Sequence, residues 1–121
     1  MITIIPLGDK SSIEELFRNN GIDTNEYSGA VVAKSGEEVL GFCLYELYKT
    51  GITILHIFPK DDLPLADGIL RSALNIAALR GALDARYVKD DALFRKLGFI
   101  LNEKDKKLDI DKLFRGCGSH T

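Results

Sequence analysis

The segment from residue 28 to residue 83 constrains the fold more than any other part of the chain. Three β-prone stretches follow one another there, at 30–33, 39–48 and 52–58, with short turns between them. Short connections of this kind join neighbouring strands that run in opposite directions. A long helix is expected directly afterwards, over 65–83, because apolar residues recur there at helical spacing. The sequence therefore predicts an antiparallel meander with one broad face of a helix packed on it.

Weaker patterns on either side predict the remaining elements. A strand over 2–5 is closed by Pro6, and a helix capped by Ser11 or Ser12 ends at Gly21. Downstream we expect a strand at 85–88, a helix at 92–97 ended by Gly98, a return to the sheet at 99–101, and a last short helix or strand at 110–114. The prediction is one α+β domain over 1–121 with a mixed, mainly antiparallel sheet flanked by helices, and with 115–121 as a flexible tail.

The pattern within one strand carries a more detailed expectation. Over 52–58, Ile52, Ile54, His56 and Phe58 alternate with Thr53, Leu55 and Ile57. Side chains of a regular strand point alternately to the two faces of the sheet. The first four side chains are therefore expected on a common face.

Bulk composition excludes several classes of partner. The chain has 121 residues, is 45% hydrophobic and 28% charged, and carries a net charge of −2. Such a balance is typical of a globular domain and suggests neither a nucleic acid nor an anionic membrane as partner. There is no long apolar run and no basic N-terminal flank. We expect a cytoplasmic protein in which Cys43 and Cys117 are free thiols.

Two motifs together suggest a family. One is Ala92-Leu93-Phe94-Arg95-Lys96-Leu97-Gly98-Phe99, a short helix that ends at glycine and turns into an aromatic residue. The other is Asp67-Gly68-Ile69-Leu70-Arg71-Ser72-Ala73-Leu74, a glycine near the start of a long helix that follows a strand and a proline. Over roughly residues 28–100 this order resembles the GNAT superfamily of N-acetyltransferases. The resemblance implies a GNAT-like (acyl-CoA N-acyltransferase) fold, acetyl-CoA as co-substrate, and a small amine or a protein amino group as acceptor.

The resemblance also implies where the cofactor binds. The family pattern Arg/Gln-x-x-Gly-x-Gly/Ala places Gly68 at the central glycine of the diphosphate loop, with Leu65 and Leu70 departing from it. The pantetheine arm is expected between the strand that ends at Phe58 and the strand near 86–88. The implied cofactor-binding residues are Phe58, Gly68, Ile69, Leu70 and Arg71. Asp67 would repel the phosphates, and Arg71, Lys60 or Lys89 would compensate if they point inward. The alternative is that Gly68 is tolerated in the first turn of the helix and that Leu65 and Leu70 belong to the core.

Acetyl transfer to an amine needs a base and, for the leaving thiolate, a proton donor. His56 and Glu46 are the candidate bases, since each lies in an otherwise apolar strand and the pKa of histidine lies near working pH. The alternative for His56 is a half-buried strand histidine without a catalytic role. The alternative for Glu46 is a side chain on the solvated face of its strand. Phe94 stands where the family often has a tyrosine acid, so Tyr87, Tyr45, Tyr48 or water would have to supply that proton.

Three interpretations remain open from the sequence. The leading one is an active N-acetyltransferase without a metal. The second is a non-catalytic GNAT-like domain that binds CoA weakly or not at all and acts through protein contacts as a homodimer; the residues at Leu65, Leu70 and Phe94 favour it. The third is an unrelated α+β binding domain.

Overall fold

The computed structural model describes residues 1–114 of the chain. In order, the elements are β1 (Ile2–Pro6), α1 (Lys10–Asn19), β2 (Ser28–Ser35), β3 (Glu38–Leu47), β4 (Gly51–Phe58), α2 (Leu63–Leu79), β5 (Asp84–Tyr87), α3 (Asp91–Leu97), β6 (Ile100–Asn102) and β7 (Lys107–Leu108). A helical turn follows at 112–114. The expected tail at 115–121, with Cys117, lies outside the described residues.

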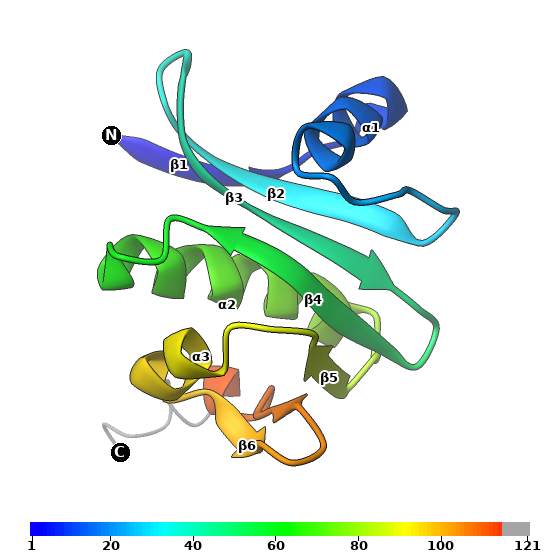
Figure 1. Ribbon diagram of the computed structural model, residues 1–121, viewed down its shortest axis with the longest axis vertical. Coiled ribbons are helices and arrows are strands. Elements are labelled where there is room, and N and C mark those ends of the chain that lie inside the picture. Colours follow the sequence, from blue (N-terminus) through cyan, green and yellow to red (C-terminus); the bar gives the residue numbers. More distant parts are fainter. Residues whose placement is uncertain (115–121) are drawn as a thin grey trace.

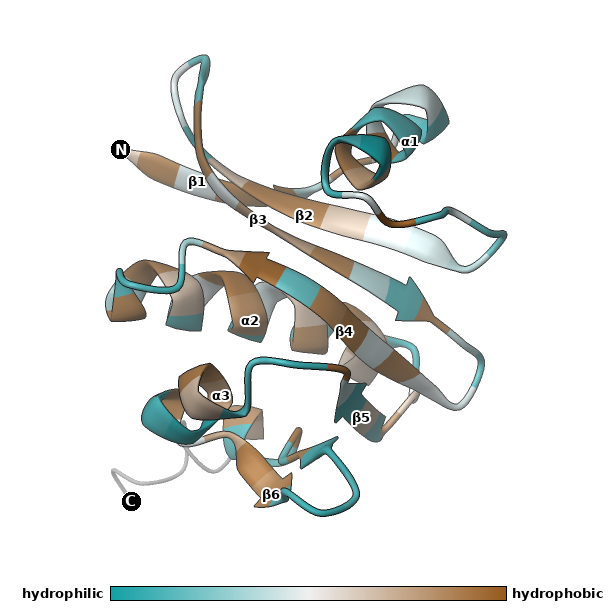
Figure 2. Cartoon of the chain, viewed as in Figure 1, coloured by the Kyte–Doolittle hydropathy of each residue, from teal (hydrophilic) through white to brown (hydrophobic). Residues whose placement is uncertain are grey.

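One seven-stranded sheet in the order β1-β2-β3-β4-β5-β7-β6 forms the centre of the molecule. All neighbouring strands are antiparallel except β4 and β5, which are parallel. The prediction of a mixed, mainly antiparallel sheet is therefore confirmed. Figure 1 shows α1 and α2 on opposite sides of the sheet, and Figure 2 shows that the strands between them are largely hydrophobic.

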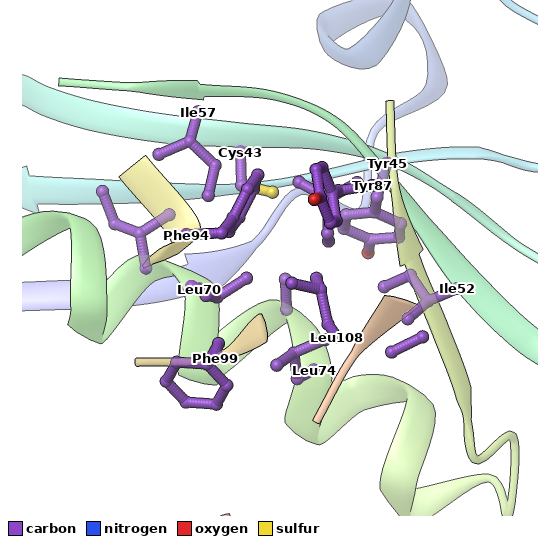
Figure 3. Packing of buried hydrophobic residues seen from close by; sticks show 14 of the residues in the cluster. Cys43, Tyr45, Ile52, Ile57, Leu70, Leu74, Tyr87, Phe94, Phe99 and Leu108 are labelled. Atoms are coloured by element: carbon purple, nitrogen blue, oxygen red, sulfur yellow. The ribbon is translucent and has the colours of Figure 1, made fainter. Parts of the chain in front are cut away.

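Two apolar clusters hold the helices to the sheet. On the α2 face, the larger cluster joins residues of α2, α3 and the sheet, among them Cys43. The Cys43 side chain is fully buried, and this burial raises the pKa of its thiol. Figure 3 shows part of this cluster. On the α1 face, Phe17 packs with Ala30 and Leu44, and Ile13 and Leu16 pack beside it. Burial of apolar surface on both faces fixes which side of each strand points to which helix.

The start of α1 differs from the prediction. Asp9, and neither Ser11 nor Ser12, is the N-cap residue. The two serine hydroxyls instead donate to the Asp9 carboxylate, at 3.0 and 2.7 Å, and these bonds lower the pKa of Asp9. The helix therefore begins at Lys10, ahead of the serines.

The long helix begins and ends earlier than predicted. Asp62 caps α2 by accepting a hydrogen bond from the Leu65 N–H at 3.2 Å, and Pro64 lies in the first turn. Both residues favour a helix start at this point. At the other end, Gly81 adopts a left-handed φ of 73°, which stops the helix before residue 83.

A β-bulge corrects the expected alternation in β4. Leu44 of β3 pairs with His56 while Tyr45 pairs with Ile54, so Leu55 is an extra residue in β4. Ile52, Ile54 and Ile57 are buried in the α2-face cluster. His56 and Phe58 lie on the α1 face instead, opposite Leu44 and Phe42. The prediction of a common face was therefore wrong, because the bulge reverses the phase of the strand.

Among residues 1–114, no helix has both the length and the apolar character needed to cross a membrane.

Candidate functional site

The parallel strands β4 and β5 diverge after a short contact. They pair over 51–54 and 84–87, and the last bond runs from the Val88 N–H to the Ile54 carbonyl at 3.1 Å. Beyond it, no described strand pairs with residues 55–58 of β4 on the side of β5. We call this opening the splay. An extended chain with amide groups can add to such an unpaired strand edge.

An ion pair lies across the mouth of the splay. Lys60, which follows β4, approaches Asp90, which follows β5, with Nζ and Oδ1 3.1 Å apart. Asp90 adopts a left-handed φ of 72°, an uncommon conformation for a residue with a side chain. Lys89 is exposed next to it. Two cations and one carboxylate thus line the place where the two strands part.

His56 lies at the bulge, beside the splay. It is half-buried, its Nδ1 is buried without a hydrogen-bond partner, and its ring lies 5.8 Å from that of Phe42. Burial lowers the pKa of His56, and the charges of Lys89 and Lys60 lower it further, against a smaller opposing effect of Asp90. The imidazole is therefore neutral at neutral pH, which is the state that can accept a proton.

Glu46 lies on the same face of the sheet as His56. It pairs with Thr53, and Leu44, two residues away along β3, pairs with His56. Its carboxylate accepts hydrogen bonds from the Asn25 side-chain amide at 2.9 Å and from the Tyr48 hydroxyl at 2.5 Å. The latter bond raises the pKa of Tyr48. Through these two bonds Glu46 ties the loop before β2 to the end of β3.

The N-terminus of α2 leaves few amides for an anion. Pro64 has no N–H, the Leu65 N–H is bound by the Asp62 side chain, and the Ala66 N–H donates to the Asp62 carbonyl at 2.9 Å. Only the Leu63 amide remains in the first turn. The carboxylates of Asp61 and Asp62 add negative charge at the same place, where a phosphate would be repelled.

Gly68 and its neighbours lie beyond this first turn, inside α2. A Cβ on Gly68 would lie 3.2 Å from Ile4 Cδ1, and Ile69 and Leu70 are completely buried. Arg71 pairs with Asp67 at 2.7 Å and lies over the ring of Phe99. Helix-interior N–H groups already donate to the carbonyls four residues earlier. Cofactor binding by these residues stays a prediction, and the geometry argues against a role for their main-chain amides.

Phe94 fills core space beneath the splay. It is 2% exposed and its ring lies 4.8 Å from that of Tyr87. Figure 3 shows Phe94 with Ile57, Cys43 and Leu70 around it. Burial, followed by the neighbouring Asp91 carboxylate, raises the pKa of Tyr87 to about 12. Tyr45 is also buried on this α2 face, whereas His56 lies on the α1 face.

Two residues that shape this site differ in how far sequence patterns predict them. The cap formed by Asp62 had a signal, since an aspartate two residues before a proline is typical of a helix start. The role of Asp90 had none, because its ion pair with Lys60 depends on how two separate loops meet. Within residues 1–114, no three histidine, cysteine or acidic side chains gather as a metal site would require.

No protein-family model matches this sequence, and no curated protein sequence matches it. Solved structures do match. A GNAT-family acetyltransferase from Streptococcus pneumoniae aligns with a TM-score of 0.57 and 16% identity, over 86% of this chain and 91% of that one. The putative N-acetyltransferase YhhK from E. coli, solved bound to coenzyme A, aligns with a TM-score of 0.59 and 15% identity, over 84% and 93% of the two chains.

A third match is a variant of the toxin AtaT, bound to the C-terminus of the antitoxin AtaR and to acetyl-CoA. Its TM-score is 0.54 at 15% identity, and the alignment covers 93% of this chain and 98% of that one. The expected fold class is confirmed: the chain has the α+β fold of the GNAT acetyltransferases.

Proposed function

We propose that this protein is an acetyl-CoA-dependent N-acetyltransferase that acts on a small amine or on a protein amino group. The observation that carries the proposal is the unpaired edge of β4 at the splay, next to the bulge that presents a neutral His56. The likeness in fold to a protein bound to coenzyme A supports it.

The residues present fit one part of acetyl-CoA better than another. The pantetheine arm carries amide groups, and residues 55–58 of β4 offer main-chain groups with which such an arm would pair. The diphosphate would not find a row of free amides at α2. Its charge would instead be met by Lys60 and Lys89, which lie at the mouth of the splay.

When bound, acetyl-CoA supplies a thioester carbonyl for attack by the acceptor amine. His56 takes the proton that the ammonium must lose before its nitrogen can attack. The new C–N bond forms as the C–S bond breaks. Phe94 offers no proton to the departing thiolate, and Tyr87 is buried on the other face, so water supplies that proton.

Calorimetric titration with acetyl-CoA, compared with free CoA, tests the cofactor part. We expect binding in the micromolar range, with weaker binding to Lys60→Ala than to a Lys104→Ala control, because Lys104 lies in the turn between β6 and β7. The absence of heat and of thermal stabilisation at millimolar ligand would contradict the proposal. An amine-acceptor screen then tests transfer, which His56→Phe should greatly slow without changing acetyl-CoA affinity.

A second candidate has its own support. A non-catalytic domain of the same fold, acting through protein contacts, would explain why Asp62 closes the N-terminus of α2 and why Phe94 occupies the tyrosine position. Failure of both acetyl-CoA and CoA to bind would favour this candidate.

A further inference from the structure

The first strand leaves one side of the sheet open. β1 pairs with β2 and with no other strand of the described residues. Its sequence, Ile2-Thr3-Ile4-Ile5-Pro6, contains no charged side chain. Proteins commonly protect an edge strand from pairing by lysines, prolines, bulges or a covering segment. Here the register is regular and only the closing Pro6 interrupts the edge.

The alternation of hydrogen bonds shows which main-chain groups point outward. Leu7, directly after β1, donates its N–H to the Ala30 carbonyl of β2 at 2.9 Å. In an antiparallel pair every second residue bonds to the partner strand, so Thr3 and Ile5 bond towards β2 as Leu7 does. Ile2 and Ile4 therefore direct both N–H and C=O to the open side. Pro6 directs only its C=O there, since proline has no N–H.

Apolar side chains accompany these groups. Ile2 is 53% exposed on the α2 face and Ile5 is 42% exposed on the other. Ile2 and Ile4 also line a surface hollow together with Pro64, Leu65 and Asp62 at the start of α2. An incoming strand would thus gain apolar contact as well as main-chain hydrogen bonds.

We propose that β1 pairs antiparallel with β1 of a second copy, across a two-fold axis at Ile4. Ile4 then exchanges two hydrogen bonds with the partner's Ile4. Each Ile2 N–H donates to the Pro6 carbonyl of the opposite chain, and the ladder ends there because Pro6 has no N–H to return. Pro6 lies on the same face as Ile2, so the ring of the partner's Pro6 comes beside the hollow at Pro64 and Leu65.

The strand favours a copy of itself over another peptide. A two-fold contact requires a surface that is its own complement. An uncharged strand meets this requirement, because no like charges face each other across the axis. Centring on Ile4 uses all five residues, whereas a two-fold at Thr3 would leave Ile5 and Pro6 outside the ladder. This inference does not depend on acetyl transfer.

Sedimentation velocity over a concentration series tests the association. We expect the wild-type chain to shift from monomer to dimer, and Ile5→Lys to remain monomeric with an unchanged circular dichroism spectrum. The matched control is Leu101→Lys, which places the same charge on β6 at the opposite edge of the sheet, where Leu101 is 62% exposed. A monomeric wild type, or loss of the dimer in Leu101→Lys but not in Ile5→Lys, overturns the proposal.

Cysteine cross-linking tests the register without relying on a destabilising change. In the proposed pairing, Thr3 lies opposite the partner's Ile5 in a non-hydrogen-bonded pair, with Cα atoms about 4.5 Å apart. A disulfide can bridge that distance. With Cys117 replaced by serine, the Thr3→Cys/Ile5→Cys variant should form a covalent dimer on oxidation, and Thr3→Cys alone should not. A dimer that fails to cross-link, or that cross-links through Thr3→Cys alone, overturns the two-fold at Ile4.

Discussion

At the scale of single residues, His56 links the geometry of the site to a property measurable without any ligand. Its Nδ1 is buried without a partner, and burial and the charges of Lys89 and Lys60 all oppose protonation. The folded protein therefore binds the His56 proton less tightly than the unfolded chain does. The neutral form is the one that the fold accommodates.

This difference predicts a pH dependence of stability. The pKa of His56 is lower in the folded state, so the unfolded chain binds more protons as the pH falls through the usual histidine range. His56 makes its full contribution to the free energy of unfolding above about pH 6.5, the pKa of histidine in the unfolded chain. That contribution is lost as the pH falls through the pKa of His56 in the folded protein. Denaturant unfolding between about pH 5 and pH 8 should show this loss in the wild type and a flatter profile in His56→Phe. Parallel profiles would contradict it.

At the scale of elements, the cap of α2 has two opposing effects. Asp62 satisfies the Leu65 amide and stabilises the helix, yet it adds a negative charge two residues from Lys60, which we propose meets the diphosphate of acetyl-CoA. Stability of the helix and affinity for an anion are therefore in conflict at this residue.

Replacing Asp62 by alanine should expose that conflict. Loss of the cap should reduce the free energy of unfolding by about 1 kcal/mol. The freed Leu65 amide and the lost negative charge should at the same time strengthen binding of acetyl-CoA. Chemical denaturation and calorimetry measure the two effects, and Asp61→Ala is the control, because only the Asp62 side chain accepts the Leu65 N–H. Unchanged or weaker binding by Asp62→Ala would contradict this expectation.

The helices and strands differ in how well the sequence predicted them. Apolar periodicity and turn residues identified the meander and the long helix, because those signals are local. The β4 bulge left no such signal, since the extra residue Leu55 is defined by pairing with β3. The motif also did not predict that Gly68 lies inside α2, because the cap at Asp62 starts the helix earlier than the resemblance implied.

Candidate site residues were therefore only partly predictable. His56 and Phe58 lie at the end of β4 beside the splay, on the α1 face, and their parts in catalysis and cofactor binding stay predictions. The diagonal placement of Glu46 and His56 on one face follows from strand register, which a single sequence specifies poorly. The ion pair between Lys60 and Asp90 arises from the meeting of two loops and has no counterpart in local pattern.

At the scale of the whole molecule, the sheet has two parts joined at one parallel contact. The meander of β1 to β4 meets β5, β7 and β6 through the short pairing of β4 with β5. At this contact the backbone leaves no room for a side chain at Gly51, where a Cβ would lie 2.0 Å from the Asp84 carbonyl oxygen. Close approach of the two strands thus requires glycine.

Gly51→Ala should accordingly push β5 away from β4. Because the clash is with backbone, which cannot move aside alone, we expect a loss of about 1–3 kcal/mol in the free energy of unfolding, the usual cost of overpacking. Gly8→Ala is the control, since a Cβ there meets nothing within 4 Å. Denaturant titration compares the two variants, and equal stability would show that the parallel contact is not tight.

The parallel contact also bears on the order in which the chain folds. Strands β2, β3 and β4 pair with neighbours in sequence across short turns, whereas pairing of β4 with β5 closes a loop that contains all of α2. Closing a longer loop costs more chain entropy before the new contacts can offset that cost. We infer that β2 to β4 assemble before the two strands of the splay come together, so that the proposed site forms late in folding.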